Sequence, residues 1–295
     1  MGSKKVICFG EVLWDALPKG IYLGGAPLNV ALNLDNLGVD SKIVSAVGND
    51  RLGGLALKSI KQKGLSTELV QVNNKPTGLA EVEIDAEGVP NYKMHENTAW
   101  DYITITDEIK EVVLQSDYLI LGTLPFRNES GNTIRELLKN YNGKCIVDVN
   151  LRAPFYSEEL VDEVLNDANI LKLNADELLK IQDWKDNNSE EEEALAWLSS
   201  EYDIETVLLS RGDKGAYIYS NGNFSKKGRY YVKVRDTVGA GDAFLAGAIY
   251  SLIKGKDAYE TICFANAVGA FVASRNGATP NLNMSKIDIY LKYGK

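Results

Sequence analysis

The sequence has few of the side chains that support histidine- or thiol-based chemistry. One histidine, His95, and three cysteines, Cys8, Cys145 and Cys263, occur among 295 residues. A single histidine excludes a histidine-rich metal site and argues against a Ser–His or Cys–His catalytic triad. Each cysteine lies in an apolar run, so we expect three buried thiols that behave as small hydrophobic side chains.

Other absences narrow the class of protein further. Lys and Arg number 32 against 41 Asp and Glu, and without a basic excess to neutralise phosphates we expect no nucleic-acid partner. The N-terminus lacks a signal-peptide h-region and no apolar run could span a bilayer, so we expect a cytoplasmic protein with no membrane partner. The GxxxxGK[ST], GxGxxG and GxSxG motifs are also missing, which excludes a P-loop nucleotide site.

Strand-like apolar runs alternate with helix-like amphipathic runs along most of the chain. Hydrophobic residues make up 45% of the sequence, enough for a large core, and no Pro- or Ser-rich linker or internal repeat divides it. The alternation predicts one α/β domain over residues 1–295, with a mainly parallel sheet covered by helices on both faces. Residues 77–105 break this pattern with hairpin-like strands around a turn at 87–88.

The most informative stretch is DTVGAGDAF at residues 236–244, between a strand expected at 231–235 and a helix expected from about 241 to 253. Two glycines permit a tight turn, and a helix start adds free N–H groups and its dipole. Together they predict an anion hole made by Gly239, Ala240 and Gly241. Phosphate would repel Asp242 there, unless this carboxylate accepts a proton from a hydroxyl that attacks phosphorus. The alternative is an ordinary Gly-rich turn in which Asp242 caps the helix.

A second group of polar residues follows the strand expected at residues 6–9. Asp15 lies just beyond that strand, and Gly25 and Asn29 flank the start of a helix expected at 27–37. Ligand-binding groups of α/β sheets lie at the carboxyl ends of strands. Asp and Asn suit adjacent sugar hydroxyls, because they offer acceptors and donors at fixed angles. By itself, Asp15 would equally well be a solvated loop carboxylate.

The stretch at 236–244 resembles the C-terminal signature of the ribokinase-like (PfkB-type) carbohydrate kinases, and GGxxxN at 24–29 matches their N-terminal signature. GEVLWD, LGGAPLNVA and DVNLR are similar to strings of the fructokinase branch. The resemblance covers essentially the full length. It implies a ribokinase-like α/β fold in which a small β lid, built from strands within 11–25 and 77–105, covers the sugar. It also implies that Asp242 is the catalytic base and that Asp15, Gly25 and Asn29 bind sugar hydroxyls.

The same resemblance implies residues on the nucleotide side. Asn174 begins the family's NxxE motif near the phosphates of ATP, although the same spacing is that of an ordinary capping box. Ser210, Gly212 and Gly215 would lie beside the ribose and phosphates, with a tight turn between two strands as the alternative. Asn266 would border the adenine, with a helix-packing stripe as the alternative.

Ions and the remaining substrate contact follow from the resemblance as well. Glu177 of the NxxE motif would organise Mg²⁺, through water, near the phosphates. Asp236 would lie beside a monovalent cation, K⁺, close to residues 274–278. Arg152 ends the DVNLR string and would lie on the substrate side, with a surface ion pair as the alternative.

The predicted lid departs from the family pattern at residues 94–100. Many fructokinase-like relatives carry an Arg a few residues before a small-Ala pair, whereas this chain reads MHENTAW without an Arg. The lid contacts of those relatives are therefore not transferred to this chain. Asn97 and His95 are candidates for contacting sugar, with an inert edge-strand His95 as the alternative.

These observations predict an ATP- and Mg²⁺-dependent kinase that phosphorylates a sugar hydroxymethyl group, with fructose converted to fructose 6-phosphate as the first choice. Another small sugar or sugar acid, such as ribose or 2-keto-3-deoxygluconate, or a nucleoside is the alternative, because each offers vicinal hydroxyls. A sugar-binding regulator on a kinase scaffold is the alternative from another class, and the intact Asp242 argues against it. A homodimer through exposed lid strands is a further hypothesis.

Overall fold

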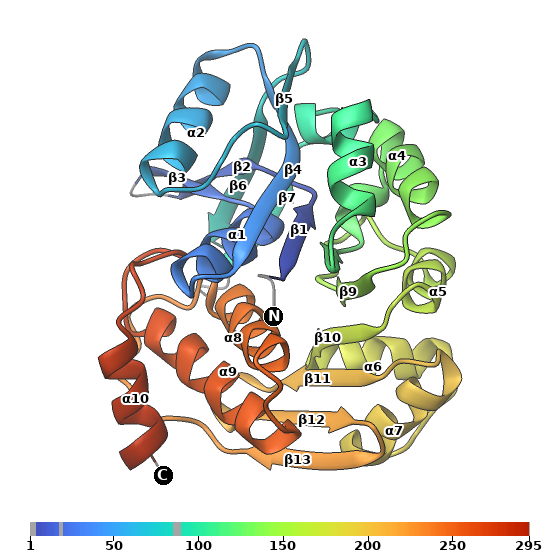
Figure 1. Cartoon of the computed structure of the whole chain (residues 1–295), viewed down its shortest axis with the longest axis vertical. Helices are drawn as coiled ribbons and strands as arrows, with labels where there is room; N and C mark the ends of the chain where they lie inside the picture. The colour runs from blue at the N-terminus through green and yellow to red at the C-terminus, as the bar shows by residue number, and fades with distance from the viewer. Residues whose placement is uncertain (1–3, 18–19, 85–89, 295) are drawn as a thin grey trace.

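The computed structural model describes residues 4–17, 20–84 and 90–294 (Figure 1). Its main sheet has nine strands, which are β1 (Lys5–Phe9), β4 (Asp40–Gly48), β5 (Val70–Asn73), β8 (Tyr118–Leu121), β9 (Lys144–Asp148), β10 (Ile170–Asn174), β11 (Thr206–Ser210), β12 (Ala216–Ser220) and β13 (Asn223–Lys227). Their order is β13-β12-β11-β10-β9-β8-β1-β4-β5. Neighbours from β5 to β11 are parallel, and β12 and β13 add an antiparallel hairpin at one edge. The predicted α/β fold with a mainly parallel sheet is confirmed.

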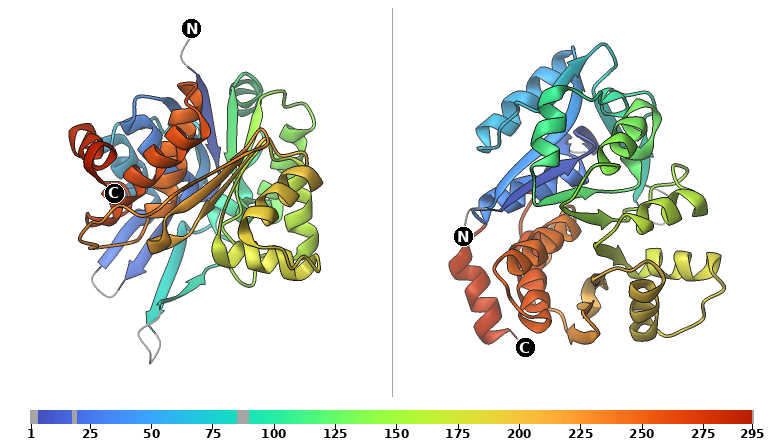
Figure 2. Two further views of the ribbon diagram at one scale, coloured as in Figure 1. Left: turned by 90° about the horizontal axis from the view of Figure 1, so that it is seen from below. Right: turned by 45° about the vertical axis from the view of Figure 1, so that its right-hand side comes forward.

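Helices cover both faces of this sheet (Figures 1 and 2). One face packs against α1 (Ala26–Asn36), α2 (Arg51–Gln62), α8 (Ala240–Ile253) and α9 (Ala258–Ala273), with α10 (Met284–Tyr293) packed on α9. The other face packs against α3 (Asp107–Leu114), α4 (Asn128–Leu138), α5 (Glu158–Asn166), α6 (Ala175–Trp184) and α7 (Glu191–Glu201). Short 3₁₀ turns are η1 (Ala99–Tyr102), η2 (Leu124–Phe126) and η3 (Gly212–Lys214). None of the helices in the described ranges is both long and apolar enough to cross a bilayer.

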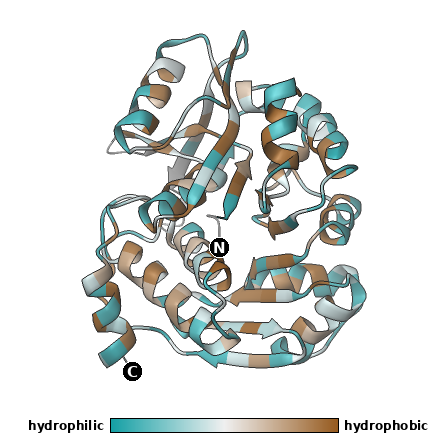
Figure 3. Ribbon diagram, viewed as in Figure 1, coloured by the Kyte–Doolittle hydropathy of each residue, from teal (hydrophilic) through white to brown (hydrophobic). Residues whose placement is uncertain are grey.

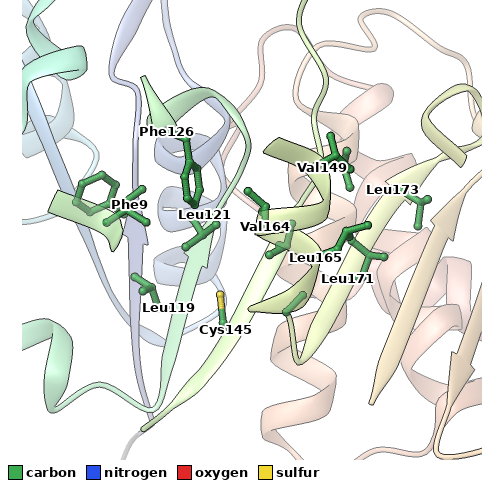
Figure 4. Packing of buried hydrophobic residues seen from close by; sticks show 14 of the residues in the cluster. Phe9, Leu119, Leu121, Phe126, Cys145, Val149, Val164, Leu165, Leu171 and Leu173 are labelled. Carbon is green, nitrogen blue, oxygen red and sulfur yellow. The ribbon is translucent and has the colours of Figure 1, made fainter. Parts of the chain in front are cut away.

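Alternation along each strand decides which of the two cores a side chain joins. In β8, Leu119 and Leu121 pack under α3 and α4, whereas Ile120 points to the α1–α8 side. In β9, Cys145 faces the first core and Ile146 the second (Figure 4). Strands that are apolar on both faces are typical of a parallel sheet buried between helix layers. Figure 3 shows the hydrophobic residues concentrated along the central strands.

The two predicted lid stretches form one small sheet. Its four strands are β2 (Leu13–Leu17), β3 (Gly20–Gly24), β6 (Gly78–Ile84) and β7 (Pro90–Met94), in the order β3-β2-β6-β7. Strand β6 pairs in parallel with β2 and antiparallel with β7, and the sheet projects from the body of the molecule (Figure 2). The turn predicted at 87–88 lies outside the described residues.

Two local expectations are wrong. Residues 231–235 form no strand: Tyr231 is 76% exposed, and the Arg235 N–H donates to the Ala273 carbonyl at the end of α9 (2.9 Å). The sheet ends at β13, and this segment does not pair with the outer edge of that strand. Cys8 and Cys145 are buried as expected, but Cys263 on α9 is only partly buried, because it lies at the edge of the helix layer.

Asp50 joins α2 to the lid, which makes its loss a test of the fold. Its carboxylate caps α2 by accepting from the Gly53 N–H (2.7 Å) and also accepts from the Thr77 N–H and hydroxyl (2.8 and 2.7 Å) just before β6. We expect Asp50→Ala to lower the free energy of unfolding by about 2 kcal/mol, since a helix cap and two hydrogen bonds are lost. Urea unfolding measures this, with Asp107→Ala in the first turn of α3 as the control. Equal unfolding midpoints for Asp50→Ala and the control would contradict it.

Candidate active site

The site lies at the carboxyl edge of the main sheet, where the strand order changes direction. After β1 the chain builds β4 and β5 on one side and then returns to β8 on the other. Such a switch point leaves an opening between neighbouring loops. A small cavity there is lined by Glu11 after β1, Thr123 after β8, and Asp148 and Asn150 at the end of β9. Asp15 on β2 brings the lid sheet to the same edge.

The turn before α8 is tight, as its glycines predict, but Ala240, one of the three predicted N–H donors, is not free. Gly239 has φ of 74°, and a Cβ there would lie 2.4 Å from the Ala278 Cβ, so only glycine fits. The helix begins at Ala240, whose N–H donates to the Thr237 carbonyl (3.1 Å). Within the described ranges, the N–H groups of Gly241 and Asp242 donate to no backbone carbonyl. Free N–H groups at the start of a helix of this length attract an anion.

One side-chain hydrogen bond joins the two signature segments, residues 24–29 and 236–244. Asn29 Nδ2 donates to Asp242 Oδ2 at 2.8 Å, across 213 residues of sequence. Asn29 is in the first turns of α1, which begins after Gly25. Gly25 has φ of 114°, and a Cβ there would lie 2.2 Å from the Glu11 carbonyl oxygen. The loop after β1 and the start of α1 therefore pack so closely that this position requires glycine.

Carboxyl groups in the site have raised pKa values. Burial raises the pKa of Asp242 to about 6, with a further contribution from Asp148 and opposing ones from Asn29, Lys172 and Arg152. Burial, assisted by the charge of Asp242, raises the pKa of Asp15 to about 6. Burial likewise raises that of Glu11 to about 7, although its carboxylate accepts from the Ala26 N–H (3.1 Å). Carboxyl groups that titrate near neutrality in an opening are suited to proton transfer.

Arg152 lies on the same side as these carboxyls. It is exposed, and its Nη1 donates to the Leu151 carbonyl (3.0 Å). Its positive charge lowers the pKa values of Glu11, Asp15 and Asp242. No carboxylate within the described ranges forms an ion pair with Arg152, so the surface ion pair is not observed.

Sequence reasoning missed a buried ion pair under the glycine turn. Lys172 Nζ lies 2.8 and 3.1 Å from the two carboxylate oxygens of Asp148, and both side chains are 7% exposed. Burial lowers the pKa of Lys172, but Asp148, Glu177 and Asp242 together raise it above its ordinary value. A lysine in the middle of the apolar run ILKLN was the available signal, because a charge in a buried strand requires a partner.

Asn174 and Glu177 form the expected capping box. Asn174 Oδ1 accepts from the Glu177 N–H (2.9 Å), and Glu177 Oε2 accepts from the Asn174 N–H (2.8 Å). Glu177 Oε1 accepts from the Leu151 N–H (3.0 Å), so this buried carboxylate joins α6 to the loop that carries Arg152. Burial raises its pKa against the opposing charge of Lys172.

The donor set fits a metal ion that is contacted through water. Both oxygens of Glu177 already accept a backbone N–H, which leaves lone pairs for water molecules but makes direct ligation less accessible. No cluster of three or more His, Cys, Asp or Glu side chains arranged to hold a metal ion occurs in the part of the chain that the structure describes.

The other predicted nucleotide residues lie on β11, on the turn that follows it and on α9. Ser210 ends β11, and Gly212 and Gly215 (φ of 56° and 95°) shape the turn into β12. A Cβ on Gly215 would lie 2.1 Å from the Lys227 carbonyl oxygen, so the turn packs tightly against the end of β13. Asn266 Nδ2 donates to that same carbonyl (3.2 Å) and ties α9 to β13.

Asp236 joins the two loops that were expected to meet. Its Oδ1 accepts from the Val238 N–H and its Oδ2 from the Gly277 N–H, both at 3.0 Å. The turn that precedes the anion hole and the loop at 274–278 are therefore in contact.

An arginine from outside the lid takes a position at its base. Arg127, after η2, pairs with the buried Asp101 (2.7 Å) and donates to the His95 carbonyl (3.2 Å). Its guanidinium lies 4.6 Å from the centre of the Trp100 ring and 4.2 Å from that of Phe155. The sequence prediction concerned an arginine within residues 94–100. No motif indicated that Arg127 would contact the lid.

The lid candidates themselves have other partners. His95 is exposed, with Nε2 3.2 Å from Glu81 Oε1. Asn97 has φ of 56°, and its Oδ1 accepts from the Tyr102 hydroxyl (2.8 Å). Within this structure, both side chains interact with neighbours at the lid.

At this site a carboxylate lies beside a helix start with free N–H groups, an arrangement that suits phosphoryl transfer to a hydroxyl group. The profile described as pfkB family carbohydrate kinase matches residues 10–284, and the chain belongs to this family of sugar kinases. Fructokinase-1 of Zea mays is 27% identical over 311 residues, which cover 95% of each chain.

Two solved structures share the fold at low identity. The fructokinase of Vibrio cholerae with fructose, ADP and calcium bound has a TM-score of 0.83 at 22% identity and covers 98% of this chain and 99% of its own. The fructokinase of Xylella fastidiosa with bound ATP has a TM-score of 0.86 at 21% identity and covers 99% of each chain. The family predicted from the two signatures is confirmed.

We expect the loss of the Arg127–Asp101 ion pair to lower the stability of the protein strongly. Arg127→Met leaves the fully buried Asp101 carboxylate without its cation, so we expect the free energy of unfolding to fall by about 3 kcal/mol. The double variant Arg127→Met with Asp101→Asn removes both charges and should recover part of the loss. Chemical unfolding of the three proteins measures this. A single variant as stable as the unmodified protein would show that the pair makes no net contribution.

Proposed function

We propose that this sugar kinase transfers the γ-phosphoryl group of ATP to a hydroxymethyl group, with D-fructose converted to fructose 6-phosphate as the leading substrate. The observation that carries the chemistry is Asp242, a partly buried carboxyl with a pKa of about 6 beside two free N–H groups of α8. The choice of fructose is supported by the fructokinase-like strings in the sequence and by the fructokinases among the relatives and similar structures.

In the proposed reaction, the sugar hydroxyl donates a hydrogen bond to Asp242. As the hydroxyl oxygen attacks the γ-phosphorus, its proton passes to the carboxylate and the bond to the ADP oxygen breaks. The N–H groups of the Gly239, Ala240 and Gly241 turn face the charge that develops on the transferred group. Because Ala240 N–H donates to Thr237, the free N–H groups of Gly241 and Asp242 supply most of this stabilisation.

Asp15, Gly25 and Asn29 orient the sugar in this proposal, with Arg152 on the same side. Asn29 Nδ2 donates to Asp242, and in this proposal its Oδ1 accepts from a sugar hydroxyl. Asp15 comes from the lid strand β2, which joins sugar binding to the position of the lid. Lid closure would exclude water and prevent hydrolysis of ATP.

On the nucleotide side, we propose that Asn174, Ser210, Gly212, Gly215 and Asn266 surround ATP. Mg²⁺ would be held through water by Glu177, and when bound it would neutralise phosphate charge. K⁺ is proposed beside Asp236, whose two oxygens already join the loops on either side. We also propose a homodimer through the lid, supported by the exposed Ile21 and Tyr22 on the edge strand β3.

A substrate panel separates the leading function from its alternatives. ADP release should depend on both Mg²⁺ and sugar and should be greatest with fructose, compared with ribose, 2-keto-3-deoxygluconate, adenosine and fructose 6-phosphate. A coupled assay measures it, and light scattering of the same sample tests the homodimer. Greater turnover with another acceptor would support the proposed phosphoryl transfer but show that fructose is not the preferred substrate. No turnover, with a sugar still raising the melting temperature, would favour the sugar-binding regulator.

Replacement of Asp242 tests the proton acceptor. We expect Asp242→Asn to lower kcat by a factor of about 10² to 10⁴ with sugar affinity largely unchanged, since only proton transfer is lost. Steady-state kinetics and calorimetric sugar titration measure the two effects. Asp183→Asn, a charge removed from α6 outside the site, is the control. A variant that turns over near the unmodified rate would remove Asp242 as the base.

The pH dependence of the unmodified enzyme gives an independent check on the same residue. Protonated Asp242 cannot accept a proton, so kcat/KM should rise with pH through about 6 and then level off. Asp15 and Glu11 titrate in the same range and also contribute to the pH dependence of kcat/KM. The residual activity of the Asp242→Asn variant reports their contribution without that of Asp242.

A further inference from the structure

The ion pair beneath the glycine turn arises from the alternation of two adjacent strands. On the face toward α8, β9 and β10 contribute Ile146 and Ile170 to the core. Two residues further along the same face, the same strands present Asp148 and Lys172, which are register partners. A pair of isoleucines in a dry core is thus followed, at the carboxyl edge, by a pair of buried charges.

The ammonium of Lys172 reaches the first turn of α8. A Cβ built on Gly241 would lie 3.6 Å from Lys172 Nζ, which is the nearest atom outside the adjacent residues and the backbone of α8. Lys172 therefore lies against the residue whose free N–H group belongs to the predicted anion hole. The two carboxylate oxygens of Asp148 hold the ammonium in place from the side of β9.

The charges around Asp242 come from several elements. Asp148 raises the pKa of Asp242, whereas Lys172 and Arg152 lower it, and the hydrogen bond from Asn29 lowers it as well. Asp15 on the lid and Glu11 after β1 also interact with Asp242. Glu177 at the start of α6 faces Lys172. The two members of the ion pair therefore shift the pKa of Asp242 in opposite directions.

We propose that Lys172 is a positioning residue of the phosphoryl site: Asp148 holds its ammonium under Gly241, where it attracts the group being transferred. This inference rests on the proposed kinase function. Lys172 acts across the backbone of Gly241 and touches neither substrate. A positive charge next to Gly241 adds to the field with which the helix start attracts an anion. Asp148 has a second effect, because its charge favours protonation of Asp242.

Four variants test the proposal. Lys172→Met removes the ammonium and leaves Asp148 buried without a partner, so it should lower stability as well as activity. The double variant Lys172→Met with Asp148→Asn removes both charges and should recover stability. Asp148→Asn alone removes the carboxylate charge and leaves the Lys172 ammonium without its ion-pair partner. The exposed pair Lys139–Glu136 on α4, changed to Met and Gln together, is the matched control.

The expected results concern kcat, nucleotide affinity and pH profile. In the double variant, kcat should stay at least about tenfold below the unmodified value, and a non-hydrolysable ATP analogue with Mg²⁺ should bind at least about fivefold more weakly, with the KM for sugar nearly unchanged. The acidic limb of kcat/KM should move to higher pH in Lys172→Met and to lower pH in Asp148→Asn. A purely structural role would not produce these opposite shifts.

The outcomes separate this inference from the proposed function. Recovery of unmodified kcat and analogue affinity in the double variant would overturn the inference, since Lys172 would then serve only to neutralise Asp148. If the unmodified protein consumes no ATP with any sugar, the kinase proposal fails, and analogue binding still decides the role of Lys172. If Lys172→Met does not fold, the double variant supplies the comparison.

Discussion

The hydrogen bond from Asn29 to Asp242 is the contact on which the arrangement of the site depends. It joins the start of α1 to the start of α8 and therefore brings together two loops that the sequence separates by 213 residues. Both helix starts are held in place by glycines, because Gly25 meets the Glu11 backbone and Gly239 meets Ala278. Side chains at either position would separate the helices and move Asn29 away from Asp242.

A second constraint is the shortage of positive charge around a site that must hold a polyphosphate. The chain carries a net charge of −9, and the acceptor side holds Glu11, Asp15, Asp148 and Asp242. Burial raises the pKa values of Glu11, Asp15 and Asp242, but near neutral pH Asp15 and Asp242 are still ionised and repel phosphate. In the proposed mechanism, attraction for phosphate comes from helix N–H groups and from Lys172, whose ammonium is held in place by Asp148.

Much of the fold and part of the site could be predicted because they depend on local patterns. Alternating strands and helices predicted the parallel sheet, and glycines at turns predicted where α1 and α8 begin. Asn174 and Glu177 formed the capping box that their spacing indicated. The strand expected at 231–235 is absent although its residues favour β structure, because the segment hydrogen-bonds to the end of α9 and Tyr231 remains exposed.

The sequence by itself determined the type of fold and the chemistry available at each loop, because periodicity, turn residues and short motifs act over a few residues. Only the tertiary structure decided which distant side chains share a site. Lys172 meets Asp148 because β9 and β10 are adjacent in register, and Arg127 meets Asp101 because the loop after β8 packs against the base of the lid. These pairings depend on strand order and packing: the run ILKLN indicates that Lys172 requires a partner but not which residue it is, and nothing in the spacing indicates the Arg127 contact.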